Sequence, residues 1–219
     1  MLIGSGMWEA IGQQLRSPSG WRGHLAGKVM EIVNREPNDV SVAALEIASD
    51  ATVLEIGCGP GMAVAQMAAA ATNGLVIGLD ASSEMLSQAA RRNRSAIKSG
   101  RVKLALGNFE GLPFDSGSID AVLAVNVAYF FSAGAELREV HRVLRPGGRL
   151  AIYATDRVTM SRWKFVGPRT HNLVDENSLT AALRVAGFDA QQTEIRKLAF
   201  RFNVRGLLAV SQKPVQPLA

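Results

Sequence analysis

"VLEIGCGPGM", residues 53–62, places three glycines and a proline within five positions, directly after an apolar run that ends in a glutamate. The apolar run reads as a buried β-strand, and the residues that follow the glycines, "MAVAQMAAAA", read as a helix. Gly57, Gly59 and Gly61 have no Cβ, so the backbone there can turn sharply and approach a ligand closely. The stretch therefore predicts a strand, a ligand-binding turn and a helix in immediate succession.

The rest of the chain repeats this alternation. Apolar or β-branched segments such as "LVIGLD", "VKLALGN", "IDAVLAVN" and "GRLAIYATD" are separated by helical ones such as "SEMLSQAARRN", "AELREVHRVL" and "SLTAALRVAGF". Strands that alternate with helices form a parallel sheet covered on both faces. The last two apolar segments, "AQQTEIRKLAF" and "FNVRGLLAVSQ", have no helix between them and predict an antiparallel hairpin. The predicted fold is a doubly wound, Rossmann-like α/β structure, mostly parallel, with an antiparallel C-terminal hairpin.

The first fifty residues read as short helices. Four apolar residues of "GWRGHLAGKVMEIVNRE" recur at helical spacing, namely Trp21, Leu25, Val29 and Ile32. We expect Pro37 to end this pattern, because proline pushes the residue before it out of helical geometry. We therefore divide the chain into a helical cap or lid over residues 1–49, a ligand-binding domain over residues 50–212 and a tail over residues 213–219.

Composition limits the class of protein. A chain of 219 residues with 47% hydrophobic residues can build a core without disulfides or metals. Cys58 is the only cysteine, and the N-terminus lacks the basic and apolar regions of a secretory leader. The apolar runs are too short to span a bilayer, which needs about 20 residues. These features predict a cytoplasmic protein without a membrane span, and they leave open whether it is a monomer or a homodimer.

The net charge of +5 raises the question of nucleic acid, because polyanions are bound mainly through neutralisation of phosphates. Six basic residues and no acidic ones lie in "RRNRSAIKSGRVK", residues 91–103. Cations at the end of a helix interact favourably with its dipole, so we interpret this segment as a solvated helix end. We therefore do not expect nucleic acid as a partner, although an anionic substrate stays open.

The spacing of the glycines helps to identify the ligand of the turn. A dinucleotide fingerprint, G-x-G-x-x-G, would need a glycine at position 62, where Met62 stands. Asp80 ends the second predicted strand, where a carboxylate can accept hydrogen bonds from both hydroxyls of a ribose. The site therefore suits a nucleoside better than a pyrophosphate, which disfavours a nicotinamide-dependent reductase.

Four segments together resemble the class I S-adenosylmethionine-dependent methyltransferases of the small-molecule type, a group that includes ubiquinone-biosynthesis enzymes. The segments are "VLEIGCGPG", "GLDASSEMLSQAARR", "GNFEGLPFDSGSIDAV" and "LREVHRVLRPGGRLAI", in the order of the family's motifs. The resemblance implies S-adenosyl-L-methionine as the cofactor and S-adenosyl-L-homocysteine as its product. It assigns Glu55, Gly57, Cys58, Gly59 and Gly61 to the amino-acid part of the cofactor, Asp80 to the ribose, and Ala81, Met85, Asn108 and Phe109 to the adenine.

One position departs from the family pattern. The family usually has an aspartate after the glycine of "GN", where this chain has Asn108. An asparagine can accept a hydrogen bond from the adenine amino group with its oxygen and can also donate one with its nitrogen. We therefore expect cofactor binding to survive with altered strength.

Methyl transfer from a sulfonium requires an electron-rich atom aligned behind the methyl group and the exclusion of water. A base helps when the acceptor is a hydroxyl or a protonated amine. The candidate bases are Tyr129 after the fourth strand, His171 in "DRVTMSRWKFVGPRTHN", and His24 in the cap. Asn126, at the end of the fourth strand, is a further candidate contact of the cofactor. His141 ends a predicted helix and is interpreted as a partner of its dipole.

The expected reaction is in-line transfer of a methyl group to an oxygen, nitrogen or carbon atom of a small metabolite. The chain lacks the N/D-P-P-Y/F motif of enzymes that methylate amino groups of nucleic acids, and a Pro-Cys pair for methylation of cytosine carbon. RNA or another nucleic acid is therefore the less favoured acceptor. A catalytically silent, cofactor-binding regulatory subunit is a further alternative, because the glycines and Asp80 indicate binding and not turnover. No metal is expected.

Overall fold

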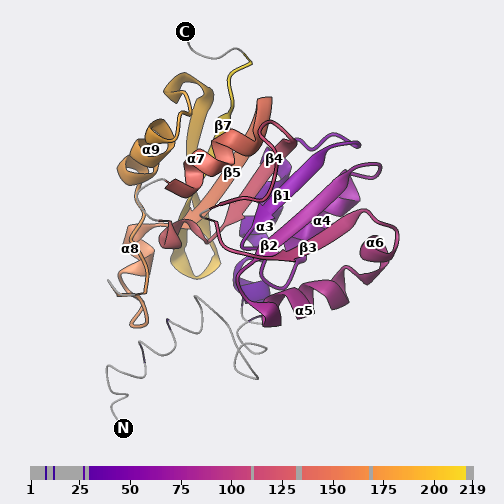
Figure 1. Cartoon of the computed structure of the whole chain (residues 1–219). Helices are drawn as coiled ribbons and strands as arrows, with labels where there is room; N and C mark the ends of the chain where they lie inside the picture. The colour runs from indigo at the N-terminus through magenta and orange to yellow at the C-terminus, as the bar shows by residue number, and fades with distance from the viewer. Residues whose placement is uncertain are drawn as a thin grey trace.

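The computed structural model describes residues 30–109, 111–131, 135–167 and 170–215 of the chain, together with residues 8, 12 and 27. Its centre is a seven-stranded sheet with the strand order β3-β2-β1-β4-β5-β7-β6 (Figure 1). The strands are β1 (Thr52–Ile56), β2 (Leu75–Asp80), β3 (Val102–Leu106), β4 (Ile119–Val125), β5 (Leu144–Thr155), β6 (Thr193–Phe200) and β7 (Val204–Gln212). Neighbours among β1 to β5 run parallel, and β7 pairs antiparallel with β5 and β6. The predicted sheet with its C-terminal hairpin is confirmed.

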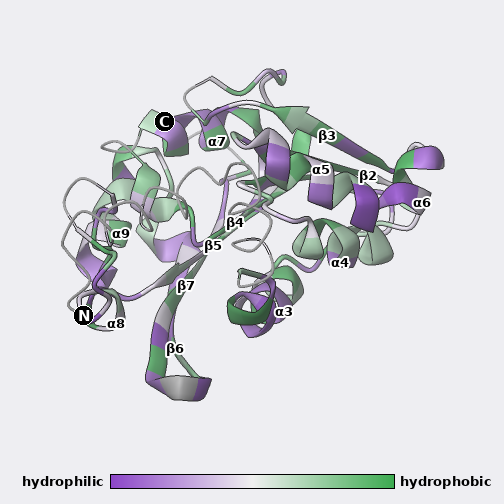
Figure 2. Cartoon of the chain, turned by 90° about the horizontal axis from the view of Figure 1, so that it is seen from below, coloured by the Kyte–Doolittle hydropathy of each residue, from purple (hydrophilic) through white to green (hydrophobic). Residues whose placement is uncertain are grey.

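Helices cover both faces of the sheet. They are α3 (Arg35–Ala44), α4 (Met62–Ala70), α5 (Ser83–Arg92), α6 (Arg94–Lys98), α7 (Ala135–Val143), α8 (Arg157–Met160) and α9 (Glu176–Val185), with short 3-10 turns η1 (Ala128–Phe130), η2 (Ala190–Gln192) and η3 (Arg201–Asn203). One apolar core lies between the sheet and α4, with α3 beside it, and the other lies between the sheet and α7 and α9 (Figure 2). Coverage of both faces explains why "TVLEI" and "LVIGLD" are apolar without alternation. Within the described ranges, the structure has no helix that is long and apolar enough to cross a membrane.

The prediction that Pro37 ends a helix is wrong. Residues 30–33 are helical, a turn falls at Asn34, and α3 begins at Arg35, which places Pro37 in the first turn of α3. A proline is tolerated there because the first amides of a helix have no partner inside it. Helix α3 packs against α4, β4 and β5. Helix α3 therefore packs as part of the layer of helices on this face of the sheet. The domain boundary at residue 49 stays a prediction.

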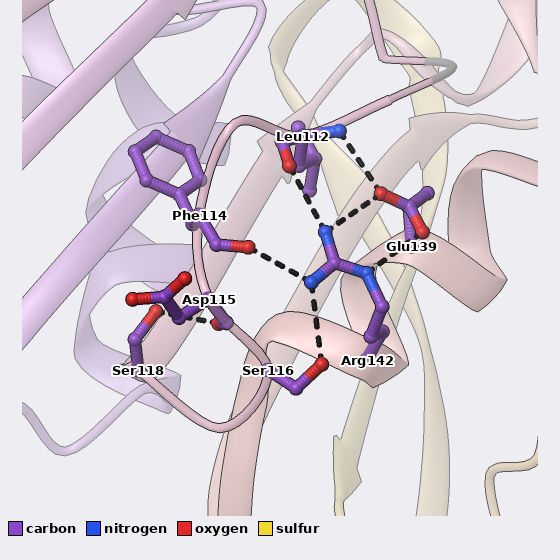
Figure 3. Close-up of polar contacts among 7 residues, drawn as sticks. All are labelled: Leu112, Phe114, Asp115, Ser116, Ser118, Glu139 and Arg142. Atoms are coloured by element: carbon purple, nitrogen blue, oxygen red, sulfur yellow. Dashed lines mark hydrogen bonds and ion pairs between the residues drawn. The ribbon is translucent and has the colours of Figure 1, made fainter.

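The connection from β3 to β4 is fastened to α7 by an arginine and a glutamate (Figure 3). Arg142 Nη1 donates a hydrogen bond to the carbonyl of Phe114 at 2.8 Å, and Nη2 donates to the carbonyl of Leu112 at 2.9 Å. Glu139 accepts hydrogen bonds from the Leu112 amide at 3.0 Å and from Arg142 Nε at 2.9 Å. We call Arg142 and Glu139 the α7 clasp. It holds residues 112–116 of this connection, and Phe109, which lies earlier in the same connection, lines the site described next.

Candidate functional site

A cavity opens at the carboxyl ends of β1, β2 and β4, where the strand order of the sheet reverses direction. The space between its walls is about 730 Å³, which includes space that is open to solvent. Three parts of the chain form its wall: the glycine turn after β1, the residues after β2, β3 and β4, and the segment just before and within α3. This is the place where ligands bind in open α/β sheets.

The glycine turn is held by the carboxylate of Asp80. The Gly59 amide donates to Asp80 Oδ2 at 2.8 Å, and the Ser82 amide donates to Oδ1 at 2.8 Å. Gly57 and Gly59 have φ values of 69° and 51°, in the left-handed region. A Cβ on Gly57 would lie 2.2 Å from Val127 Cγ1, whereas one on Gly59 would meet nothing within 4 Å. The turn is therefore tightly packed at Gly57 and open at Gly59.

Two carboxylates are buried beneath this turn. Glu55 is 4% exposed and Asp80 is 9% exposed. Burial raises the pKa of Glu55 well above its usual range, and the charge of Asp80 raises it further. Burial also raises the pKa of Asp80, against the opposing effect of the Ser82 and Gly59 amides. Among the described residues, Glu55 Oε2 has no hydrogen-bond partner. A cationic ligand group would satisfy this oxygen and favour its charged form.

Asn126 connects three parts of the chain at the edge of the cavity. It follows β4 with a φ of 56°, a conformation that asparagine tolerates better than most residues. Its Oδ1 accepts hydrogen bonds from the Tyr129 hydroxyl at 2.6 Å and from the Thr155 amide at 3.0 Å. Its Nδ2 donates to Oδ1 of Asn34 at 2.8 Å. One side chain thus joins the ends of β4 and β5 to the segment before α3.

Most residues predicted to contact the cofactor line this one cavity. They are Glu55, Gly57, Cys58, Gly59, Asp80, Ala81, Met85, Phe109 and Asn126. Gly61 is not in the lining, because it packs against Ala89 and Asn93 of the neighbouring α5 region. Asn108 is exposed and also lies outside the lining. Contact of these residues with a cofactor stays a prediction.

Neither Tyr129 nor His171, the two predicted bases that the structure describes, is among the residues that line the cavity. Tyr129 is buried, and burial raises its pKa far above its usual range. His171 is 8% exposed, with its ring centroid 5.8 Å from that of Tyr129 and 5.2 Å from that of Phe130. Phe130 does line the cavity, so Tyr129 and His171 lie together next to one of its wall residues. His24 lies outside the described residues. The roles of all three as bases stay predictions.

Sequence reasoning predicted a cap or lid from the N-terminal segment but did not identify which of its residues line the cavity. The wall that this segment contributes consists of Met30, Glu31, Asn34 and Asn38. Glu31 forms an ion pair with Arg92 of α5, at the start of the basic run. The apolar spacing predicted a helix in this region. It could not show which side of the segment faces the cavity, because that depends on Arg92 and Asn126, which are distant in the sequence.

Comparison with known proteins agrees with this geometry. The methyltransferase domain family matches residues 53–148, from β1 into β5. YdaC, an uncharacterized methyltransferase of Bacillus subtilis, is 32% identical over 129 residues, which cover 58% of this chain and 69% of YdaC. The O-methyltransferase resE of Aspergillus sclerotiorum is 30% identical over 134 residues, which cover 60% of this chain and 50% of resE. The alignments span about half or less of the length of most of the first curated relatives.

A solved structure shares the fold over nearly the whole chain. It is a chain of the Haloferax volcanii complex that contains the Trm112 methyltransferase activator. The TM-score is 0.74 with 21% identity, over 98% of this chain and 99% of that chain. At this level of identity the similarity concerns the fold alone, and it confirms the Rossmann-like architecture.

Proposed function

This chain belongs to the class I S-adenosylmethionine-dependent methyltransferases, and we propose that it transfers a methyl group from S-adenosyl-L-methionine to a small-molecule acceptor. The observation that supports the proposal most strongly is a pair of buried carboxylates, Glu55 and Asp80, beneath an open glycine turn. Such a pair lowers the stability of the fold, so a bound cation that compensates it is the simplest reason for its presence.

The residues of the cavity fit this cofactor. Glu55 Oε2, which has no partner among the described residues, can accept a hydrogen bond from an ammonium group. The Asp80 carboxylate accepts two amides and keeps further lone pairs for the hydroxyls of a ribose. Met85 and Phe109 offer apolar surface to a purine ring. These four residues would hold the ammonium, ribose and adenine parts of the cofactor.

When bound, the cofactor supplies an electrophilic methyl group on a sulfonium. The chain's own task is to orient the reacting groups and to exclude water. Val127, Phe130 and Met30 supply apolar wall, and Asn34 and Asn38 supply amide groups. This mixture suits an uncharged or amphipathic acceptor, methylated on oxygen, nitrogen or carbon. The catalytic roles of Tyr129, His171 and His24 are part of this proposal.

The basic run offers little support for the alternative of a nucleic-acid acceptor. Arg92 Nε donates to the carbonyl of Pro60 at 3.2 Å, and the same guanidinium pairs with Glu31. Arg101 Nη1 donates to the carbonyl of Ala68 at 2.7 Å. Both cations thus have structural partners within the fold, which supports a small-molecule acceptor.

Transfer of tritium tests the proposed function. The full chain is incubated with S-adenosyl-L-[methyl-3H]methionine and a bacterial cell extract, and the products are separated into small molecules and acid-precipitable material. We expect label in the small-molecule fraction. Label confined to RNA or protein would contradict the acceptor class, and binding of the cofactor without any transfer would favour the silent-subunit alternative.

A further inference from the structure

We propose that Asn34 is a positioning residue, which holds the N-terminal wall of the cavity in place through its hydrogen bond to Asn126. The inference rests on the proposed function, since this wall encloses the proposed cofactor cavity. It depends on three observations: a helix start that Asn34 does not cap, a fixed amide at Asn126, and a neighbouring attachment of the wall that is exposed to water.

Asn34 occupies the N-cap position of α3 without capping it. An asparagine at this position usually accepts a hydrogen bond from the second or third amide of the helix. Its side chain makes no such bond here. The third residue of α3 is Pro37, which has no amide proton to donate. The sequence thus removes one of the two usual partners and leaves Asn34 Oδ1 available for a contact outside the helix.

The outside contact is the amide of Asn126, whose orientation is fixed. Asn126 Oδ1 accepts from the Tyr129 hydroxyl at 2.6 Å, from the Thr155 amide at 3.0 Å and from Thr155 Oγ1 at 3.2 Å. Because these donors occupy the oxygen, the nitrogen is directed toward Asn34, where it donates at 2.8 Å. Asn34 therefore meets a preoriented donor at the carboxyl edge of the sheet.

This contact anchors a short piece of wall. Met30, Glu31 and Asn34 line the cavity within one stretch of backbone that leads into α3. The Asn34 amide donates to the carbonyl of Met30, and the Asn38 amide donates to the carbonyl of Asn34, each at 2.8 Å. Glu31 attaches the wall to α5 through Arg92, but the two side chains are 28% and 34% exposed, so water and salt weaken the pair. The amide pair between Asn34 and Asn126 is part-buried and uncharged. Its loss should free the wall and let a bound cofactor leave sooner.

A matched pair of variants in the full chain tests this role. Asn34→Leu has a similar size and no acceptor, whereas Asn34→Asp keeps an acceptor oxygen for Asn126. The measured quantity is the dissociation rate of S-adenosyl-L-homocysteine in a stopped-flow displacement experiment. We expect S-adenosyl-L-homocysteine to dissociate roughly three- to tenfold faster from Asn34→Leu than from the wild type. Its dissociation rate from Asn34→Asp should match that of the wild type. Asn34→Leu should melt at a temperature a few degrees lower, because Asn126 Nδ2 loses its acceptor, and Asn34→Asp should melt close to the wild type.

Two further measurements keep the inference separate from the proposed function. In the absence of ligand, amides 30–34 of Asn34→Leu should exchange hydrogen faster than those of the wild type, whatever the cofactor is. In an Asn126→Gly background, which permits the left-handed backbone, Asn34→Leu should have no added effect. Equal hydrogen exchange in the wild type and in Asn34→Leu would overturn the inference. An added effect of Asn34→Leu in the Asn126→Gly background would overturn it as well. Failure of the wild type to bind S-adenosyl-L-homocysteine would instead overturn the proposed function.

Discussion

Glu55, the last residue but one of β1, carries a carboxyl group that the fold buries near that of Asp80. The sequence identified Asp80 as a site candidate because it ends the second predicted strand, and it identified Glu55 through the resemblance to the methyltransferase family. It could not show that Glu55 Oε2 has no partner among the described residues, because that depends on how α4 and two neighbouring strands cover it. Residue identity predicts the site, and packing determines the electrostatics.

Replacement of this acid should separate stability from binding. In the folded protein the pKa of Glu55 is raised, so its protonated form stabilises the fold at low pH, and this contribution is lost as the pH rises through the folded pKa. Glu55→Gln cannot ionise, so its free energy of unfolding should exceed that of the wild type at pH 8, by about 1 kcal/mol or more, and approach it at pH 5. Binding of S-adenosyl-L-homocysteine should be weaker. Urea denaturation at pH 5 and pH 8 measures the free energy of unfolding, and calorimetric titration measures the affinity for S-adenosyl-L-homocysteine. A stability difference that does not change with pH would contradict the account.

The aromatic residues after β4 mark a limit of sequence reasoning. The position of Tyr129 after the fourth strand made it a candidate base, but among the described residues it is the neighbouring Phe130 that lines the cavity. The short turn η1 directs Tyr129 into the interior, where its hydroxyl donates to Asn126. In a 3-10 turn, neighbouring residues point in different directions, and no periodicity in the sequence shows which one faces a site.

At the scale of elements, the glycine turn and the strands on either side were predictable because each has a local signature. The different roles of the individual glycines were not. Gly57 is in contact with Val127, which follows β4, and Gly59 faces open space. This difference arises from tertiary packing.

Alanine at these two glycines should have different consequences. Both positions have a left-handed φ, so both variants share that cost. Gly57→Ala adds a clash with Val127 and should lose about 1 to 3 kcal/mol more stability than Gly59→Ala. Gly59→Ala should instead weaken binding of S-adenosyl-L-homocysteine, because its new methyl group projects into the cavity. Denaturation and calorimetry on both variants distinguish them, and equal stability losses would refute the packing argument.

The α7 clasp is a second element-scale feature, and no sequence pattern predicted it (Figure 3). Arg142→Ala removes the donors to the carbonyls of Leu112 and Phe114. It also removes the guanidinium whose hydrogen bond to Glu139 lowers the pKa of that carboxyl. We expect a melting temperature a few degrees lower. Arg138→Ala, which replaces an exposed arginine of the same helix, is the control and should change little. If both variants melt alike, the clasp does not stabilise the loop.

At the scale of the whole molecule, the alternation of strands and helices predicted the layers, the parallel sheet and the hairpin. For the N-terminal segment, the sequence predicted a cap or lid but not where it contacts the rest of the chain. Three residues before Met30 are described, and each lies near another part of the chain. Lys164 Nζ lies 5.8 Å from the ring centroid of Trp8, and a Cβ added to Gly12 or Gly27 would lie 2.4 Å from Phe165 O or 2.3 Å from Gln88 Oε1. The segment therefore approaches both α5 and the region of His171.

Deletion of residues 1–20 tests the lid interpretation. We expect affinity for S-adenosyl-L-homocysteine to stay within about tenfold of the wild type, because all the described residues that line the cavity are retained. Methyl transfer should fall much further, because the acceptor side loses its cover. Calorimetry and tritium transfer on the truncated chain, with its melting curve as the folding control, measure the two effects. Unchanged turnover in a folded protein would move the acceptor site toward the segment around His171.

The central claim is that the cavity beneath the glycine turn binds S-adenosyl-L-methionine, and calorimetric titration with S-adenosyl-L-homocysteine tests it most directly. The wild type should bind one molecule per chain, and Asp80→Ala should bind about tenfold or more weakly, because it loses the acceptors of the ribose and of the Gly59 amide. NADH, titrated in parallel, should not bind. Binding of NADH in place of the thioether, or equal affinity in a folded Asp80→Ala protein, would contradict the claim.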